Sequence, residues 1–162
     1  MIFAKSFFKA MESKKKKYIG LIDKIDALID QEISITGNLA GIAAVLKQEM
    51  DFFWVGFYLV NNQRLEIGPY QGPLACVQID FGKGVCGKCW KEQIPIIVDD
   101  VSSYNGHIAC NPNSKSEIGI PIFDKHKNVK MVLDVDSDKL SDFSELDEYY
   151  LLKVAKIAEG LL

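Results

Sequence analysis

The sequence lacks any apolar run long enough to cross a membrane, which takes about 20 residues of α-helix. Its first eight residues are mostly apolar but are interrupted by Lys5, and they show neither the basic start nor the small-residue cleavage site of a secretory signal. We therefore expect a cytoplasmic protein with no membrane partner. Thiols in that compartment are normally kept reduced unless they take part in catalysis.

The chain also lacks an excess of positive charge, since its formal net charge is -3. This balance provides no field for holding a polyanion, so we expect no nucleic-acid partner. The run Lys14–Lys17 is a local exception, and we interpret it as the solvated face of a helix.

Internal repeats and low-complexity tracts are absent as well, so there is no sign of a second domain. With 162 residues, of which 48% are hydrophobic, the chain can bury a core without help from disulfides or a metal. We predict one domain over residues 1–162, in which residues 1–34 form an N-terminal helical extension and residues 35–162 form the core. The four cysteines are then available for chemistry.

The spacing of apolar residues predicts helices at both ends of the chain. Leu21, Ile25 and Leu28 share one helical face, and residues 39–46 form a second helix for which Thr36 or Asn38 is the expected N-cap. Residues 141–145 should begin a last amphipathic helix.

The middle of the chain is rich in aromatic and β-branched segments, which are typical of strands. The predicted strands are 52–60, 64–67, 75–81, 94–98, 117–124 and 129–136, the first two joined by a hairpin. Helices flanking a mostly antiparallel sheet make an α+β fold. The connection 99–116 is long for a compact domain, and such loops are often functional.

The segment 82–87 matches the pattern GxGxxG, which suggests a dinucleotide site. Only residues 88–93 separate it from the next strand, too few for the crossover helix of that fold. We interpret the segment as a tight turn into a helical turn. Free backbone N–H groups there would favour the thiolate of Cys86.

The cysteines allow a zinc site as an alternative. Cys86 and Cys89 form a CxxC pair, and His107 with Cys110 forms an HxxC pair, a combination that resembles a four-ligand zinc site. That hypothesis leaves Cys76 unexplained. Cys76 alternates with Val77 and Ile79, so it also fits a buried strand position.

Three carboxylates stand in two predicted apolar strands. Asp134 and Asp136 are two residues apart and therefore share one face of a strand, and Glu117 begins the other strand. Acids on one face repel one another unless a cation or a proton lies between them. They indicate either a solvated face or a cluster that binds an ammonium group or a metal ion. Trp54 and Tyr58 also share a face and fit either core packing or the wall of an apolar pocket.

Several of these motifs together resemble the GAF-domain free methionine-(R)-sulfoxide reductases. The match runs from about Ile35 to the C-terminus and keeps the family's order and spacing. The motifs that carry it are Trp54–Tyr58, Gly68–Gly72, Ala75-Cys76, Gly84–Gly87, Gly106–Cys110, Ser116–Ile118 and Leu133–Ser137. The resemblance implies a GAF-like six-stranded antiparallel sheet, a homodimer, and reduction of free methionine-(R)-sulfoxide with a thioredoxin-like reductant. It implies no metal and no organic cofactor.

The resemblance also implies roles for individual residues. Cys110 would be the nucleophile, and Cys76 and Cys86 the resolving or relay thiols. Glu117, Asp134 and Asp136 would surround the ammonium group and the sulfoxide, with Trp54 and Tyr58 against the methylthio end. Cys89 is not part of the family set, so a Cys86–Cys89 bridge could compete for the resolving role. A non-catalytic GAF sensor and a zinc-stapled interaction domain are the other function classes that the sequence allows.

Overall fold

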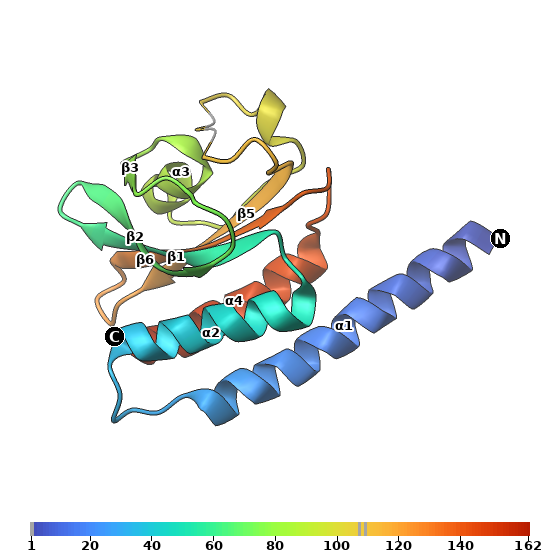
Figure 1. Ribbon diagram of the computed structural model, residues 1–162, viewed down its shortest axis with the longest axis horizontal. Helices are drawn as coiled ribbons and strands as arrows, with labels where there is room; N and C mark the ends of the chain where they lie inside the picture. Colours follow the sequence, from blue (N-terminus) through green and yellow to red (C-terminus); the bar gives the residue numbers. More distant parts are fainter. Residues whose placement is uncertain (1, 107, 109) are drawn as a thin grey trace.

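A six-stranded sheet forms the centre of the computed structural model, which describes residues 2–106, 108 and 110–162 (Figure 1). Its strands are β1 (Trp54–Asn61), β2 (Arg64–Gln71), β3 (Gln78–Asp80), β4 (Ile96–Val98), β5 (Ser116–Phe123) and β6 (Val129–Ser137). They lie in the order β3-β2-β1-β6-β5-β4, and every neighbouring pair is antiparallel. The predicted α+β class with a six-stranded antiparallel sheet is confirmed.

The helices divide unequally between the two faces of the sheet. On one face lie α2 (Ile35–Met50) and α4 (Glu145–Glu159), with the long α1 (Ile2–Leu28) packed outside them (Figure 1). On the other face lie the short α3 (Gly84–Glu92) and the long loops. None of the described helices combines the length and apolar character needed to span a membrane.

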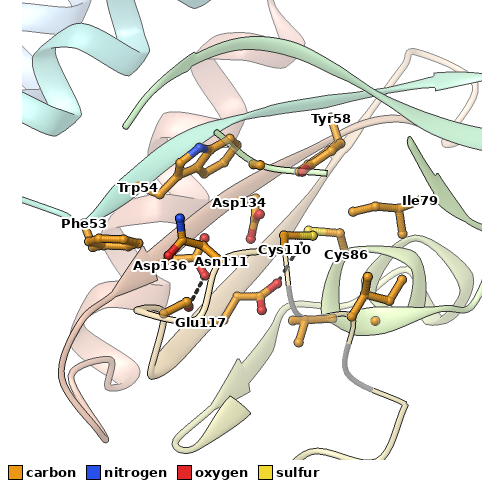
Figure 2. A pocket seen from close by; sticks show the side chains of 15 residues that line it. Phe53, Trp54, Tyr58, Ile79, Cys86, Cys110, Asn111, Glu117, Asp134 and Asp136 are labelled. Atoms are coloured by element: carbon orange, nitrogen blue, oxygen red, sulfur yellow. Dashed lines mark hydrogen bonds between the residues drawn. The ribbon is translucent and has the colours of Figure 1, made fainter. Parts of the chain in front are cut away.

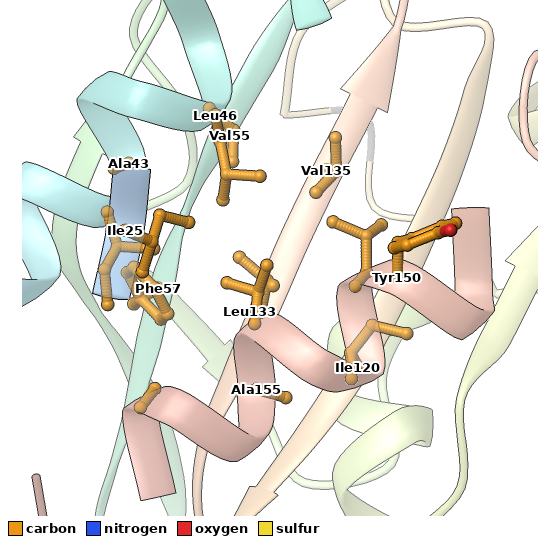
Figure 3. Packing of buried hydrophobic residues seen from close by; sticks show 14 of the residues in the cluster. Ile25, Ala43, Leu46, Val55, Phe57, Ile120, Leu133, Val135, Tyr150 and Ala155 are labelled. Carbon is orange, nitrogen blue, oxygen red and sulfur yellow. The ribbon is translucent and has the colours of Figure 1, made fainter. Parts of the chain in front are cut away.

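The main core fills the space between the sheet and the three long helices. Val55 and Phe57 of β1 and Leu133 and Val135 of β6 are all buried toward it, as strand alternation requires (Figure 3). Helix residues such as Leu46 complete the cluster. Since the apolar half of each strand faces this core, the alternate positions are left to face α3.

The start of α2 differs from the prediction, whereas the start of α4 agrees with it. Ser34, rather than Thr36 or Asn38, caps α2, because its hydroxyl accepts a hydrogen bond from Gly37 N at 3.2 Å. Asn38 is instead turned back onto Asp30, donating to its carbonyl at 2.8 Å. The predicted start of α4 is confirmed, since Ser144 and Asp147 form a capping box there.

The buried carboxylate of Asp147 ties α1 to α4. It accepts hydrogen bonds from Tyr18 Oη at 2.7 Å and from the Ser144 backbone N–H at 2.9 Å, and it pairs with Lys14 Nζ at 2.7 Å. The interpretation of the lysine run as a purely solvated face is therefore wrong for Lys14. This residue anchors the extension to the domain.

Two strands are shorter than predicted. β3 covers only residues 78–80 and β4 only 96–98. Cys76 precedes β3 and does not lie at an interior strand position as expected. Its carbonyl accepts a hydrogen bond from Tyr58 Oη at 2.8 Å, and its sulfur is in a disulfide, so these bonds hold the segment in place of a ladder.

Candidate active site

Strand register places an aromatic ring and two carboxylates in one row on the α3 side of the sheet. Trp54 of β1 pairs with Asp136 of β6, which pairs in turn with Glu117 of β5. In the next row on the same face, Asp134 stands between Gly56 and Gly119. The predicted sharing of a face by Asp134 and Asp136 thus extends to residues of two further strands.

The two glycines beside Asp134 allow other groups to close over the sheet. A Cβ atom on Gly56 would lie 2.7 Å from the Trp54 ring and 2.3 Å from Tyr70 Cβ. A Cβ atom on Gly119 would lie 3.3 Å from Cys89 Cβ. Glycine therefore lets the Trp54 ring approach from one side and α3 from the other, which leaves Asp134 at the bottom of a narrow space.

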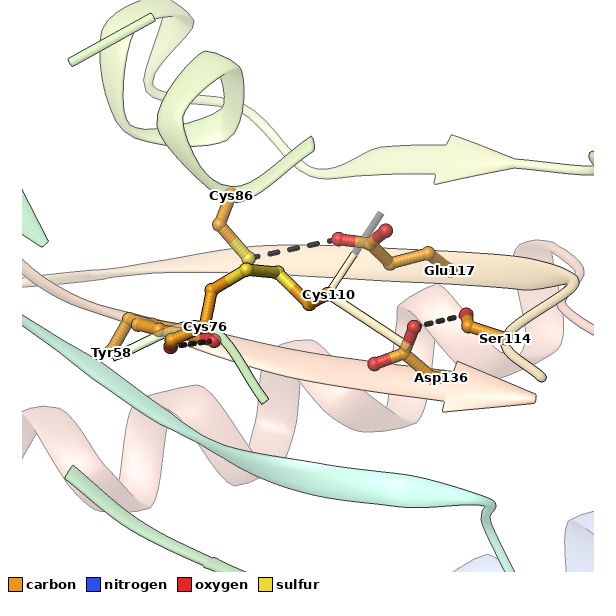
Figure 4. The surroundings of a disulfide bond; sticks show 7 residues. All are labelled: Tyr58, Cys76, Cys86, Cys110, Ser114, Glu117 and Asp136. Carbon is orange, nitrogen blue, oxygen red and sulfur yellow. Dashed lines mark hydrogen bonds between the residues drawn. A yellow bond between two sulfur atoms is a disulfide. The ribbon is translucent and has the colours of Figure 1, made fainter. Parts of the chain in front are cut away.

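The helix α3 delivers a thiol to this space. Gly82 and Gly84 have φ angles of 74° and 60°, which glycine adopts without strain, and they turn the chain sharply into the helix. Cys86 and Cys89 both face the sheet and are buried. Cys86 Sγ lies 3.8 Å from Glu117 Oε1 (Figure 4). Cys89 instead packs on Gly119. The interpretation of the GxGxxG segment as a turn into a helix is supported, and the helix runs to nine residues.

The long loop before β5 closes the site from above. Its Cys110 forms a disulfide with Cys76 (Figure 4). Cys86 and Cys89 are free thiols. Near its end Ser114 Oγ donates a hydrogen bond to Asp136 Oδ1, and Lys115 N bonds to Ser137 O at 2.8 Å. A covalent bond and two hydrogen bonds therefore hold this loop over the carboxylates.

These elements enclose a narrow cavity (Figure 2). Seven of the eight residues predicted for the site line it, and the eighth, Cys76, is bonded to one of the seven, Cys110. The seven are Trp54, Tyr58, Cys86, Cys110, Glu117, Asp134 and Asp136.

Several other residues that line the cavity were not predicted from the sequence, among them Phe53, Asn111 and Ser114. Phe53 directly precedes Trp54, and Ser114 lies three residues before Glu117 in the segment that leads into β5. A hydroxyl just before an acid-bearing strand is the signal that could have found Ser114. Asn111 carries no comparable signal.

Burial raises the pKa of each of the three acids of the site. Burial and the neighbouring Asp134 raise the pKa of Glu117 well above its usual range, and burial with Asp136 does the same for Asp134. Burial also raises the pKa of Asp136 to about 6, although its hydrogen bond from Ser114 works in the opposite direction. Asp136 is therefore mostly ionised at neutral pH, whereas Glu117 and Asp134 hold their protons more strongly than ordinary carboxyl groups do.

The expected thiolate at Cys86 is contradicted. Burial, followed by the charges of Asp134 and Glu117, raises the pKa of the Cys86 thiol well above its usual value. The N-terminal turn of α3 does not offset these effects. Cys86 is thus a protonated thiol in this state.

The structure does not support the alternative of a four-ligand zinc site made by CxxC and HxxC. Cys110 is bonded to Cys76 and has no free thiol, whereas Cys86 and Cys89 are free. His107 lies outside the described residues. A different set, Cys86 with Glu117 and Asp134, does bring potential metal ligands within 4.8 Å of one another.

Two buried polar atoms of the cavity have no hydrogen-bond partner among the described residues. One is the indole N–H of Trp54, a donor, and the other is Asp134 Oδ1. Buried polar groups normally find partners, because leaving one unpaired costs about 1–3 kcal/mol. A donor and an oxygen without hydrogen-bond partners in the same cavity indicate that a polar ligand binds there.

The chain is similar in sequence to a known domain family and to several known proteins. The GAF domain family model matches residues 34–159. The GAF domain-containing protein A of Dictyostelium discoideum is 47% identical over 91% of this chain and 94% of its own length. The free methionine-R-sulfoxide reductase of Escherichia coli is 36% identical over 93% of this chain and 91% of its own length.

A solved structure extends the similarity to three dimensions. The free methionine-R-sulfoxide reductase of Neisseria meningitidis, in complex with its substrate, matches with a TM-score of 0.88 and 43% sequence identity, over 91% of this chain and 89% of that one. The two proteins therefore share both their fold and a large part of their sequence.

Proposed function

The chain belongs to the GAF domain family, among the free methionine-R-sulfoxide reductases, and we propose that it reduces free methionine-(R)-sulfoxide to methionine with Cys110 as nucleophile. One observation carries the assignment of residues. A disulfide joins Cys110 to Cys76 at a cavity whose floor holds three carboxyl groups. This is the product state that a thiol-dependent reduction would leave behind.

The acids would activate the sulfoxide. Its sulfur is a weak electrophile until the oxygen is protonated, and the raised pKa values of Glu117 and Asp134 keep a proton available near neutrality. The Cys110 thiolate attacks the sulfur, the S–O oxygen passes to Cys110 as a sulfenic acid, and methionine leaves. Trp54 and Tyr58, stacked at 5.9 Å between ring centroids, would hold the apolar methylthio end.

Cys76 would resolve the sulfenic acid. Its thiol attacks the Cys110 sulfur and releases water, which forms the disulfide. An external dithiol then returns both cysteines to thiols and is itself oxidised. Because Cys76 rather than Cys86 is bonded to Cys110, we assign resolution to Cys76 and leave Cys86 as a secondary relay thiol.

Asp136 would select the free amino acid. It is the acid of the site with the pKa nearest its usual range, so it carries charge at neutral pH and would face the substrate ammonium group. A peptide-bound sulfoxide has a neutral amide there and leaves the carboxylate without its cation. Removing one partner from a buried charge pair costs ~3–5 kcal/mol, which is roughly 10²- to 10³-fold or more in discrimination.

Three further properties are proposed from the family resemblance. A thioredoxin-like protein is the expected dithiol, since the reaction consumes one dithiol per turnover. A cytoplasmic location fits that requirement. A homodimer is in keeping with the exposed apolar side chains of Met11 and Ile19 along α1.

The test is an amino-acid analysis of reactions that contain the protein, dithiothreitol, and the separated R or S sulfoxide of methionine. We expect methionine from the R form alone. Cys110→Ser should abolish its formation, whereas Cys89→Ser, a matched change of a thiol that packs on Gly119, should retain most activity. N-acetylated methionine-(R)-sulfoxide should be almost inert. Near wild-type turnover by Cys110→Ser would refute the assignment, and disulfide formation without methionine would favour a redox sensor.

A further inference from the structure

Three potential metal ligands from three elements meet in the cavity. Cys86 comes from α3, Glu117 from β5 and Asp134 from β6, and one donor atom of each lies within 4.8 Å of the others. Figure 2 shows the three side chains directed toward one another. They are 1%, 7% and 5% exposed, so this is a buried site rather than an acidic surface patch.

The unpartnered oxygen of Asp134 independently indicates a ligand at this point. Asp134 Oδ1 is buried and has no hydrogen-bond partner among the described residues. The flanking positions on both neighbouring strands are Gly56 and Gly119, which bring no side-chain donor. A cation bound between Asp134 and Glu117 would supply the missing interaction and relieve the repulsion between the two acids.

The donor set suits a zinc ion. One sulfur and two carboxylate oxygens match the ligands that Zn²⁺ accepts, at about 2.3 Å for sulfur and 2.0–2.2 Å for oxygen. Tetrahedral bonds of those lengths separate the ligand atoms by about 3.5 Å. Cys86 Sγ and Glu117 Oε1 are already 3.8 Å apart. Side-chain movements of about 1 Å would complete the geometry, and three protein ligands leave a fourth position open toward the cavity.

We propose that Cys86, Glu117 and Asp134 bind a zinc ion, and that this ion excludes methionine sulfoxide from the site. The binding stands on the geometry of the three side chains. The exclusion rests on the proposed function, because Glu117 and Asp134 are the groups assigned there to the sulfoxide. Zinc would thus act as a reversible inhibitor that blocks the enzyme through a thiol other than its nucleophile.

Binding is tested on the oxidised protein, in which the Cys76–Cys110 disulfide leaves Cys86 and Cys89 as the only thiols of the four cysteines. Cobalt(II) serves as the probe, because a thiolate ligand gives it a charge-transfer absorption. We expect one cobalt ion per chain with this band, and its loss on addition of zinc. Cys86→Ser should lose the band, and Asp134→Asn should weaken binding at least about tenfold.

Cys89→Ser is the matched control, since Cys89 lies one turn along the same helix and should leave the band intact. A band that survives Cys86→Ser, a band that disappears in Cys89→Ser, or no band at all would overturn the proposed site. Circular dichroism of each variant confirms that it is folded.

Exclusion is tested in a single turnover of reduced protein without added dithiol, which would itself bind zinc. Methionine release should slow as zinc rises and recover with excess methionine-(R)-sulfoxide, in wild type and in Cys89→Ser alike. Inhibition that excess sulfoxide does not relieve would overturn the exclusion. Absence of methionine without zinc would instead refute the proposed function, and the cobalt result would stand independently of it.

Discussion

Asp136 provides a test of how much an ionised carboxylate in the site lowers the stability of the folded protein. Burial raises its pKa from 3.8 to about 6, which corresponds to at most about 3 kcal/mol of unfavourable free energy once the group is ionised in the folded state. Asp136 is only partly buried, so solvent screening lowers the figure, and we expect about 2 kcal/mol. Asp136→Asn removes this ionisation and keeps an oxygen that can accept the hydrogen bond from Ser114.

The sign of the pH dependence follows from the raised pKa. Below the unfolded-state pKa, near 4, Asp136 is protonated in both states and contributes no difference. As pH rises from about 4 through about 6, the unfolded chain loses this proton first, so the wild-type protein loses stability. The Asn variant lacks that loss. It should match wild type at pH 4 and be about 2 kcal/mol more stable at pH 8.

Urea denaturation of the oxidised protein at pH 4 and pH 8 measures the effect. Asp138→Asn is the control, because Asp138 is exposed and lies two residues further along the same segment. Its free energy of unfolding should change equally at both pH values. An Asp136→Asn variant that gains the same stability at pH 4 as at pH 8, or that is less stable at pH 8, would refute the reasoning. Its reductase activity should fall in either case.

Three other variants probe separate parts of the structure. The Cys76→Ser variant should release about one methionine per chain and then stop with a sulfenic acid on the nucleophile, which mass spectrometry would detect. Continued turnover at the wild-type rate would count against Cys76 as the resolving thiol. Ser114→Ala removes a hydrogen bond that lowers the pKa of Asp136, so the acidic limb of the pH profile of kcat/KM should move to higher pH, and an unchanged profile would exclude this positioning role. Asp147→Ala should lower the free energy of unfolding by about 3 kcal/mol in urea titrations, because it strands buried donors, while the exposed Glu145→Ala should change it by less than about 0.5 kcal/mol.

Most of the correct predictions of the fold and the site came from the alternation of side chains along the strands. It set Asp134 and Asp136 on one face of their strand and Trp54 and Tyr58 on one face of theirs, and in the structure both pairs line the same cavity. Cross-strand register is not a local property, so the alignment of Trp54 with Asp136 and Glu117 needed the fold. The resemblance, rather than periodicity, brought the cysteines into the same site.

Errors arose where tertiary contacts override local pattern. Cys76 alternates with apolar neighbours as a strand residue would, but its disulfide and the hydrogen bond from Tyr58 hold it outside β3. Cys86 stands near a helix N-terminus, which favours a thiolate, but burial beside two acids outweighs that effect. Neither the burial nor the neighbouring acids can be deduced from positions close in sequence.

The pairing of Trp54, Asp136 and Glu117 across three strands has a consequence for changes in chain length. Side chains alternate between faces, so deletion of one residue within β6 before Asp134 would turn both of its acids into the apolar core and expel Leu133 and Val135 from it. A substitution at one of these positions changes a single side chain, whereas a deletion moves every following side chain of the strand to the opposite face of the sheet. Insertions should be accepted instead in the turn 124–128, where Asp124 accepts backbone hydrogen bonds at the edge of the molecule away from the cavity. A library that varies loop length there and leaves the strands intact should preserve the row formed by Trp54, Asp136 and Glu117.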